Sequence, residues 1–372
     1  MHRLMAGVTI LEHELSELRL LVERQTGILL DCPNSALAAH VAEYLESHDL
    51  ESPAALMNRL RAADQDPSLL PTFLDGVLNV NTGFFRHPGA MNALARQVVP
   101  QIYARKSEDG PSTLRIWSAG CGTGEEPYSI AMALCDAASG GNGNGSTNGT
   151  GNGNGAKEKS PVSRNGGIAE SSAPSCVVQG TRDWSIHIVG SDLLPSAIEV
   201  AERGLYPQSA LTGLPPAAIR SCFSKIGSAS NAGQNGALET PQNGSSNGAS
   251  NGGNSGSGSS AGNGSNGSSN GAHLLVKPRL RSLVTFNTMN LTRPVYIGRF
   301  DCIFCMDVLP HLSRAQRIAL MERLHLYLEP GGYLFLSQTE KLCAPNLNFR
   351  SETFDGYTVH RKPLAASAAY GR

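Results

Sequence analysis

A glycine-rich loop between an apolar run and an amphipathic run carries residues that could do chemistry. The apolar run Leu114–Trp117 leads into Ala119-Gly120-Cys121-Gly122-Thr123-Gly124, and the acidic pair Glu125 and Glu126 follows at once. Three glycines within five residues let the backbone turn sharply and approach a ligand where a Cβ would clash. The free N–H groups of a helix that begins here would point at the same ligand. The pattern therefore predicts a ligand-binding turn of the nucleotide type between a strand and a helix.

Two phosphate-binding fingerprints are the alternatives to a nucleoside site, and neither fits. A dinucleotide turn reads Gly-x-Gly-x-x-Gly, whereas Gly120, Gly122 and Gly124 are spaced one residue shorter. A P-loop ends in Gly-Lys-Ser or Gly-Lys-Thr, and this loop ends in two glutamates. A carboxylate repels a pyrophosphate but attracts a ribose hydroxyl or an ammonium group. We therefore interpret the loop as a binding site rather than as an ordinary tight turn. The ligand that fits it is a nucleoside with a cationic tail, S-adenosylmethionine.

Composition and charge narrow the class of protein. The chain has 372 residues and a formal net charge of −1, which offers no basic field for nucleic acid. No apolar run approaches the ~20 residues that cross a bilayer, so we expect no membrane insertion. Eight cysteines are scattered along the sequence, as in a reduced cytoplasmic protein. We expect a cytoplasmic protein that acts as a monomer.

One pair of cysteines has a spacing that resembles a metal site. Cys302 and Cys305 lie three residues apart in an expected strand. Positions three apart in a strand face opposite sides of the sheet, so the two thiols cannot easily share one ion. We therefore expect both cysteines to pack in the core, and we expect no metal site.

Two tracts rich in Gly, Asn and Ser, 139–175 and 227–272, bury too little apolar surface to offset backbone entropy. We expect them to be disordered insertions. Ahead of them, apolar residues at helical spacing predict an N-terminal helical domain over 1–95. Its first helix is expected to end at Gly27, and the later ones to cover about 34–47, 52–63 and 68–78.

From Leu114 onward, apparent strands alternate with apparent helices, which is typical of an α/β fold with a doubly wound parallel sheet. Strands are expected at 114–118, 186–191, 282–287, 299–305 and 332–337, and helices at 125–137, 195–203 and 313–328. Asp355-Gly356 lies between two strand-like runs and predicts a terminal antiparallel hairpin. We interpret 96–366 as a second domain, with a small β-subdomain inserted at about 214–290.

Several motifs in one order resemble the CheR-type chemotaxis receptor methyltransferases. The likeness covers about residues 11–361 apart from the two tracts, and it includes the glycine loop and the segment Asn81-Thr82-Gly83-Phe84-Phe85-Arg86-His87-Pro88. Further matching segments are Leu18–Val22 with Thr26–Ile28, Ser191-Asp192 with Ala201–Tyr206, Phe300–Cys305 and Leu328–Phe335. The resemblance implies a Rossmann-like, S-adenosylmethionine-dependent methyltransferase domain over 96–366.

The resemblance also implies an activity, the transfer of methyl groups from S-adenosylmethionine to glutamate side chains on the cytoplasmic helices of methyl-accepting chemoreceptors. It assigns Thr82 and Arg86 to the cofactor's amino-acid end, Asp192 to the ribose and Asn290 to the adenine. The implied cofactor-binding residues are Asn81, Thr82, Arg86, Ala119, Gly120, Gly122, Glu125, Asp192, Asn290, Leu291 and Asp307. Asp192 is also a candidate N-cap of the helix at 195–203.

The chain departs from the family pattern beside the expected methyl-transfer site. Val80 stands where the family has asparagine, Met306-Asp307 where many members have Arg-Asn, and His311 where they have tyrosine. Two alternatives therefore stay open: a signalling module that binds S-adenosylmethionine without turnover, and a methyltransferase for a small molecule or another protein. Because a tract splits the subdomain at 214–290, we expect weak or no docking of receptor tail peptides.

Methyl transfer to glutamate needs no general base, because a carboxyl group with a reference pKa of about 4.3 is ionised at neutral pH. The chain must instead hold the acceptor carboxylate in line and keep water away. We assign no catalytic acid or base, and we predict Arg86 and His311 as positioning residues. Arg86 is the better candidate for a carboxylate clamp, since its planar fork makes two charge-assisted bonds. Phe84 and Phe85 are expected to belong to the core.

Overall fold

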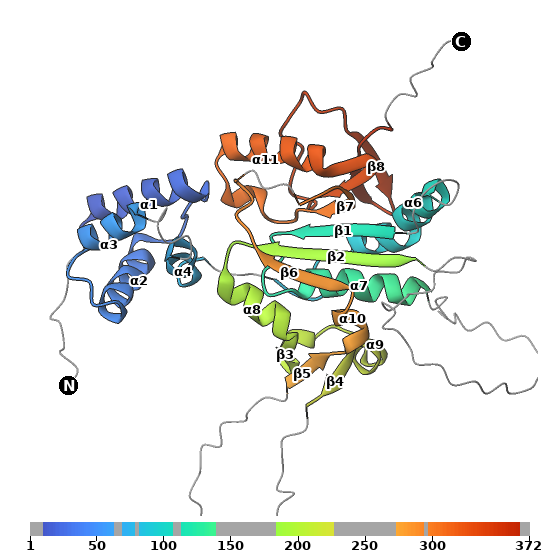
Figure 1. Cartoon of the computed structure of the whole chain (residues 1–372), viewed down its shortest axis with the longest axis horizontal. Coiled ribbons are helices and arrows are strands. Elements are labelled where there is room, and N and C mark those ends of the chain that lie inside the picture. The colour runs from blue at the N-terminus through green and yellow to red at the C-terminus, as the bar shows by residue number, and fades with distance from the viewer. Residues whose placement is uncertain are drawn as a thin grey trace, which may run out of the picture.

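The computed structural model describes residues 10–62, 69–78, 82–106, 113–138, 184–226, 273–293 and 297–364. The tracts 139–175 and 227–272, for which disorder was expected, lie outside these described residues, as does Asn81. The described part consists of a seven-stranded sheet with helices on both faces, an N-terminal helical unit, and a small second sheet (Figure 1).

The large sheet has the strand order β6-β2-β1-β7-β8-β10-β9. Its strands are β1 (Thr113–Ala119), β2 (Ser185–Asp192), β6 (Val284–Thr288), β7 (Phe300–Phe304), β8 (Leu328–Phe335), β9 (Arg350–Phe354) and β10 (Tyr357–Arg361). The first five strands in this order, β6, β2, β1, β7 and β8, run parallel to one another. Strand β10 pairs antiparallel with both β8 and β9. The doubly wound sheet and its terminal hairpin confirm the fold predicted from the sequence. The order reverses between β1 and β7, and sheets of this kind bind ligands at that switch point.

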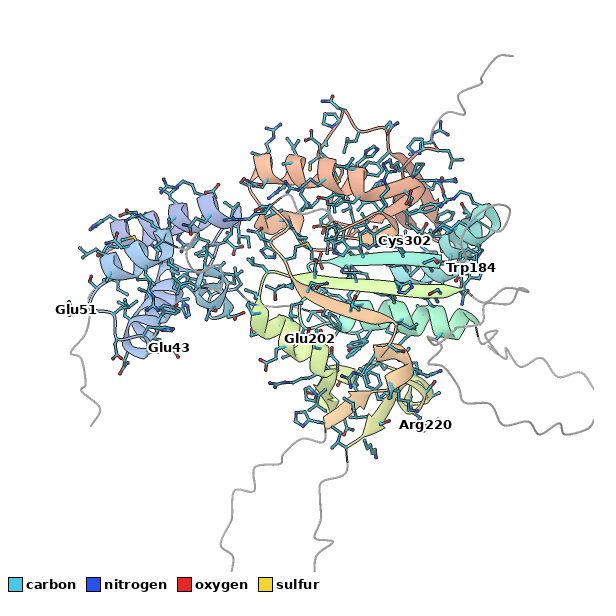
Figure 2. The ribbon with its side chains drawn as sticks, in the orientation of Figure 1. Glu43, Glu51, Trp184, Glu202, Arg220 and Cys302 are labelled. Atoms are coloured by element: carbon cyan, nitrogen blue, oxygen red, sulfur yellow. The ribbon has the colours of Figure 1, made fainter. Side chains whose placement is uncertain are left out.

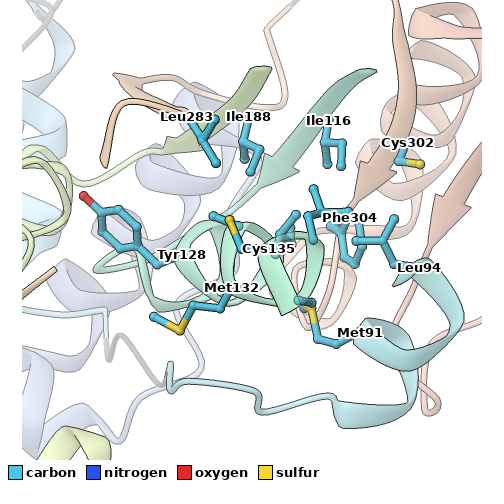
Figure 3. Packing of buried hydrophobic residues seen from close by; sticks show 14 of the residues in the cluster. Met91, Leu94, Ile116, Tyr128, Met132, Cys135, Ile188, Leu283, Cys302 and Phe304 are labelled. Carbon is cyan, nitrogen blue, oxygen red and sulfur yellow. The ribbon is translucent and has the colours of Figure 1, made fainter. Parts of the chain in front are cut away.

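Helices cover both faces of this sheet. One face carries α5 (Pro88–Ala93), the π-helical turn η1 (Leu94–Val98), α6 (Val99–Lys106) and α7 (Glu125–Ala138), and the other carries α11 (Arg314–Tyr327). Met132 and Cys135 of α7 belong to the same buried cluster as Ile116, Ile188 and Phe304 (Figure 3). Cys302 belongs to this core, whereas Cys305 belongs to the core under α11, so the two thiols face opposite sides as predicted.

The N-terminal unit contains α1 (Glu12–Thr26), α2 (Asn34–Ser47), α3 (Pro53–Arg61) and α4 (Leu69–Asp75). Glu43 and Glu51 lie on its outer side, away from the large sheet (Figure 2). Its core continues into Leu194 and Ala197, at the start of α8 (Pro195–Arg203), so the unit packs directly on the sheet domain. The buried residues of α5, η1 and α6 belong instead to the core of the large sheet. We therefore draw the border between the two units before Pro88 rather than after residue 95.

The small sheet has the order β3-β5-β4 and lies below the large one in Figure 1. Its strands are β3 (Leu205–Pro207), β4 (Phe223–Lys225) and β5 (His273–Val276), and its helices are η2 (Gln208–Leu211), α9 (Pro216–Cys222) and α10 (Pro278–Arg281). The β-rich excursion thus begins earlier than the predicted residue 214. Residues 284–288, which the prediction included, pair with β2 in the large sheet instead. Among the described helices, none combines the length and the apolar character needed to span a bilayer.

Candidate active site

A cavity of about 390 Å³ opens where the carboxyl ends of β1, β2, β6 and β7 meet, at the switch point of the large sheet. A cavity of this size suits a small-molecule ligand. The predicted site residues that line it are Thr82, Arg86, Gly120, Gly122, Asp192, Asn290, Leu291, Asp307 and His311. Two predicted residues, Ala119 and Glu125, are buried beneath the glycine loop and are not among the lining residues.

The glycine loop follows β1 as predicted and turns with positive φ at Gly120, Gly122 and Gly124, at +82°, +54° and +93°. A Cβ on Gly120 would lie 2.4 Å from Cγ2 of Val308, and one on Gly124 would lie 2.6 Å from Cβ of Ala201. Any other residue at these two positions would be strained both by its backbone and by its neighbours. The loop therefore approaches the rim of the cavity closely because it has no side chains there.

Asp192, at the end of β2, is anchored by backbone groups. Its Oδ2 accepts the N–H of Gly122 at 2.8 Å, and its Oδ1 accepts the N–H of Leu194 at 3.0 Å. Burial raises the pKa of this carboxyl, and the backbone hydrogen bonds oppose that shift. The N-cap of α8 is Leu194, so the prediction that Asp192 caps this helix is wrong. The carboxylate is instead a link between the glycine loop and the start of α8.

The acidic pair at the start of α7 divides between two roles. Glu125 is buried, and it accepts hydrogen bonds from the hydroxyls of Thr123 and Thr82. It thereby ties the Thr82 segment to the helix. Glu126 lines the cavity and accepts a hydrogen bond from the Ser118 hydroxyl at 2.6 Å. Burial raises the pKa of Glu126 to about 7.

Arg86 pairs with an acidic residue at another part of the cavity. Asp307 Oδ2 lies 3.2 Å from Nη2 of Arg86 and 2.9 Å from Nε2 of His87. Asp307 and Glu340 both raise the pKa of Glu126, whereas Arg86 lowers it. The clamp predicted at Arg86 is thus engaged by a carboxylate of the chain itself.

The N-terminal unit closes one side of the cavity, which sequence reasoning missed. It contributes Ile28, Asp31, Cys32, Val77 and Leu78 to the lining. The N–H of Leu29 donates to the carbonyl of His311 at 2.8 Å, and Ile28 forms a β-bridge with Leu312. The position of His311 is therefore set by a segment almost three hundred residues away in sequence, which no local pattern reveals.

Other lining residues were also missed. They are Gly83, Phe85, His87, Met91, Cys121, Glu126, Ser129, Leu193, Leu194, Met289, Thr292, Val308 and Leu312. Met306, which was expected beside the methyl-transfer site, also lines the cavity. Phe85 contacts both the cavity and the core, whereas Phe84 packs edge-on against Tyr206 and Phe223 in the core as predicted. Glu126 and Cys121 stand inside the glycine-loop motif, so a signal for them was present.

The sequence of this chain is similar to those of known methyltransferases. The family described as "CheR methyltransferase, SAM binding domain" matches residues 80–145 and 265–357. Chemotaxis protein methyltransferase 1 of Pseudomonas aeruginosa is 24% identical over 348 residues, covering 90% of this chain and 96% of its own length. Chemotaxis protein methyltransferase Cher2 of Pseudomonas putida is 24% identical over 353 residues, covering 91% and 98%.

The chain is similar to the CheR-type methyltransferases in its matched domain and along most of its length. Its cofactor is S-adenosylmethionine, in agreement with the matched domain. Among solved structures, a glycopeptide N-methyltransferase complexed with S-adenosylmethionine aligns over 77% of this chain and 72% of that one. Its 12% sequence identity and TM-score of 0.26 are too low to bear on the site.

The residues that line the cavity fit that cofactor. A carboxylate offers about four acceptor positions, and the backbone hydrogen bonds that Asp192 accepts do not use all of them, so it can still accept one from a ligand hydroxyl. The lining contains four acidic residues and a single arginine, and no lysine, among the described residues. Such a balance favours a ligand with a cationic sulfonium and ammonium over one with phosphates.

Proposed function

We propose that this chain is a protein-glutamate O-methyltransferase that acts on the cytoplasmic helices of methyl-accepting chemoreceptors, in a chemotaxis or related chemosensory pathway. The observation that carries the proposal is a single cavity, lined at once by the glycine loop, by Asp192 and Asn290, and by Arg86 and His311. The names of the relatives supply the chemosensory context. We infer a monomer in the cytoplasm, where these receptor helices lie.

In this proposal the lining residues divide the work of binding. Asp192 accepts hydrogen bonds from the ribose, Asn290 and Leu291 contact the adenine, and Thr82 and Arg86 hold the amino-acid end. Gly120 and Gly122 let the backbone approach the ligand without a Cβ in between. Ala119 and Glu125 are buried beneath the loop, and Glu125 accepts a hydrogen bond from Thr82. The resemblance alone assigns Asn81 to the cofactor.

The chemistry then consists of positioning. When bound, S-adenosylmethionine supplies a methyl group on a positively charged sulfonium, which a carboxylate oxygen can attack directly. Met91, Met306 and Val308 line the cavity with apolar surface and so exclude water, which favours a reaction that merges an anion with a cation. Arg86 and His311 orient the acceptor, and no residue needs to take a proton, because a glutamate is already ionised.

A second candidate, a module that binds S-adenosylmethionine without turnover, is favoured by one observation. Arg86 is paired with Asp307, so the cation expected to hold a carboxylate is already occupied. Binding without methyl transfer would follow if this pair never opened.

The experiment that separates the two candidates uses the full-length chain with tritiated S-adenosylmethionine and cytoplasmic fragments of chemoreceptors. We expect incorporation of label that base releases as methanol, since methyl esters of glutamate are base-labile. A receptor fragment with its acceptor glutamates changed to glutamine is the matched control and should take up no label. Saturable cofactor binding with no base-labile label on any receptor would support the non-catalytic module. Label on other lysate components would point to a different acceptor.

A further inference from the structure

The Asp307 corner of the cavity is built to present one carboxylate to two donors. Its Oδ2 lies 3.2 Å from Nη2 of Arg86 and 2.9 Å from Nε2 of His87. All three side chains line the cavity, and they are 31%, 37% and 20% exposed in that order. The interaction is therefore open to a ligand rather than sealed in the core.

The backbone of Asp307 is held in place by a second carboxylate. Glu340 accepts the N–H groups of Asp307 at 3.1 Å, of Leu309 at 2.9 Å and of Ser337 at 2.9 Å. Asp307 has a positive φ of 58°, which is uncommon for a residue other than glycine. This fixed turn aims the side chain at Arg86, so the pairing is a property of the loop rather than of one flexible rotamer.

Arg86 is the single arginine of the described lining, which contains no lysine. Two acids act on it: Asp307 pairs with it directly, and Glu126 interacts with its charge. A ligand carboxylate that enters the cavity must therefore compete with an internal carboxylate for the same guanidinium and imidazole. Charge-assisted pairs of this kind are the strongest polar contacts available to it.

We propose that Asp307 occupies the carboxylate-binding position of this cavity as an internal competitor, and that a ligand carboxylate binds by displacing it from Arg86 and His87. Asp307 is then a specificity-determining residue, because it lowers the affinity for any ligand whose carboxylate reaches this position. Two ligands offer that chemistry: the α-carboxylate of the cofactor and the side chain of an acceptor glutamate. The second source rests on the proposed function, whereas the first does not.

The test compares Asp307→Asn with the unchanged chain by calorimetric titration of two nucleosides. S-Adenosylhomocysteine carries the α-carboxylate, and 5′-methylthioadenosine lacks the whole amino-acid end. If the cofactor is the source, Asp307→Asn binds S-adenosylhomocysteine about three- to tenfold more tightly, the value of a partly exposed charged contact. Binding of 5′-methylthioadenosine stays the same. Equal tightening for both nucleosides would overturn the proposal, since it would then reflect the whole cavity.

The acceptor arm repeats the titration with a glutamate-bearing receptor peptide and enzyme saturated with S-adenosylhomocysteine. Tighter peptide binding by Asp307→Asn, with the nucleosides unchanged, assigns the position to the acceptor. Unchanged or weaker binding of every carboxylate ligand overturns the proposal. These are binding measurements, so a chain that transferred no base-labile methyl group to receptors would refute the proposed function while the cofactor arm could still be measured.

Two further variants exclude indirect effects. Asp307→Gly also lacks the carboxylate and suits a positive φ, so it must reproduce the gain of Asp307→Asn. In an Arg86→Gln background, Asp307→Asn must no longer increase the affinity, because Asp307 then has no guanidinium to occupy. A gain that persists there would contradict the proposal. Asp355→Asn is the matched control, since Asp355 also has a positive φ (47°) but lies in the β9–β10 turn away from the cavity.

Discussion

Asp192 and Asp307 both line the cavity, but the chain holds them in different ways. Asp192 accepts hydrogen bonds from the backbone N–H groups of Gly122 and Leu194, which lie on either side of it. Asp307 pairs with the side chains of Arg86 and His87, from a segment more than two hundred residues earlier. The first carboxylate is fixed by the main chain, and the second can exchange its partners without any change of fold.

This difference suggests separate roles for the two carboxylates: Asp192 in binding nucleosides, and Asp307 in selecting among ligands that carry a carboxylate. A carboxylate held by main-chain groups keeps its remaining acceptor positions in one place, which suits recognition of an invariant ribose. A carboxylate held by an arginine and a histidine responds to any other anion that reaches them. We therefore expect changes near Asp192 to affect folding and all nucleosides alike, and changes near Asp307 to affect only ligands with a carboxylate.

The largest effect is expected from Gly124→Ala, which disturbs the loop that supplies a hydrogen bond to Asp192. Gly124 has a φ of +93°, and an added Cβ would lie 2.6 Å from Cβ and 3.0 Å from Cα of Ala201. Backbone strain and overpacking together should lower the free energy of unfolding by about 3–5 kcal/mol. Denaturant unfolding followed by circular dichroism measures the change.

Gly213→Ala is the matched control for this substitution. Gly213 also has a positive φ, +99°, but nothing lies within 4 Å of an added Cβ. Its cost should be the backbone strain alone, about 1–2 kcal/mol. Equal losses in the two variants would mean that the contact with Ala201 contributes nothing to the loop.

Asp192→Asn should weaken nucleoside binding about ten- to a hundredfold. An asparagine has one acceptor oxygen, so its amide N–H₂ would face the N–H of Gly122 or of Leu194, and a buried donor would be left unpaired. Titration with S-adenosylhomocysteine and with 5′-methylthioadenosine should show the same loss for both. A loss confined to S-adenosylhomocysteine would break the contrast with Asp307. Asp355→Asn again serves as control.

Much of the Asp192 corner could be predicted from the sequence, because its causes are local. Three closely spaced glycines predict the turn after β1, and Asp192 stands at the end of an apolar run, where β2 ends in the structure. The hairpin could also be predicted from neighbouring residues. Asp355 and Gly356 have φ of +47° and +81°, as an Asp-Gly turn between strands requires. Such features depend on neighbours within a few residues.

The Asp307 corner could not be predicted in the same way. The resemblance assigned Arg86 and Asp307 to the same cofactor, but no residue near Arg86 reveals that the two side chains pair with each other, since the sheet order sets their separation. The wall from the N-terminal unit was missed for the same reason, because Ile28 meets Leu312 only in the folded chain. The small sheet was expected to begin at 214, since β3 has only three residues and resembles a loop.

Glu126 interacts electrostatically with both Asp307 and Arg86. Its ionisation should make the free energy of unfolding depend on pH. Burial, together with Asp307 and Glu340, raises its pKa from an ordinary value of 4.5 to about 7. The folded chain then holds a proton that the unfolded chain has released, so the free energy of unfolding falls as pH rises from 4.5 to 7. We expect Glu126→Gln to remove about 1–2 kcal/mol of this dependence.

Unfolding curves between pH 5 and pH 8 measure the difference for the two proteins. The unchanged chain should lose stability relative to Glu126→Gln across this range, and the gap should narrow in Asp307→Asn, which lacks one of the raising charges. Parallel curves for the unchanged chain and Glu126→Gln would show that Glu126 is ionised throughout and that Asp307 and Glu340 do not act on it.

The smallest effect is expected where the N-terminal unit meets the nucleoside side of the cavity. The hydroxyl of Thr292 lies 2.8 Å from the carbonyl of Thr26 and 2.8 Å from Oδ1 of Asn290. Thr292→Val keeps the shape but leaves that carbonyl without this donor, which should cost about 1 kcal/mol of unfolding free energy. Because Asn290 and Ile28 both line the cavity, binding of 5′-methylthioadenosine should weaken about two- to threefold.

Thr358→Val provides the comparison, since the Thr358 hydroxyl pairs with Thr353 on the exposed hairpin at 3.1 Å. That variant should change the unfolding free energy by less than about 0.5 kcal/mol and leave nucleoside binding unaltered. If Thr292→Val lowered stability but not nucleoside affinity, the N-terminal unit would stabilise the fold without shaping the adenosyl site. A parallel loss of both would show that docking of this unit shapes the part of the cavity that Asn290 and Ile28 line, whereas the Asp307 carboxylate pairs with the side chains of Arg86 and His87.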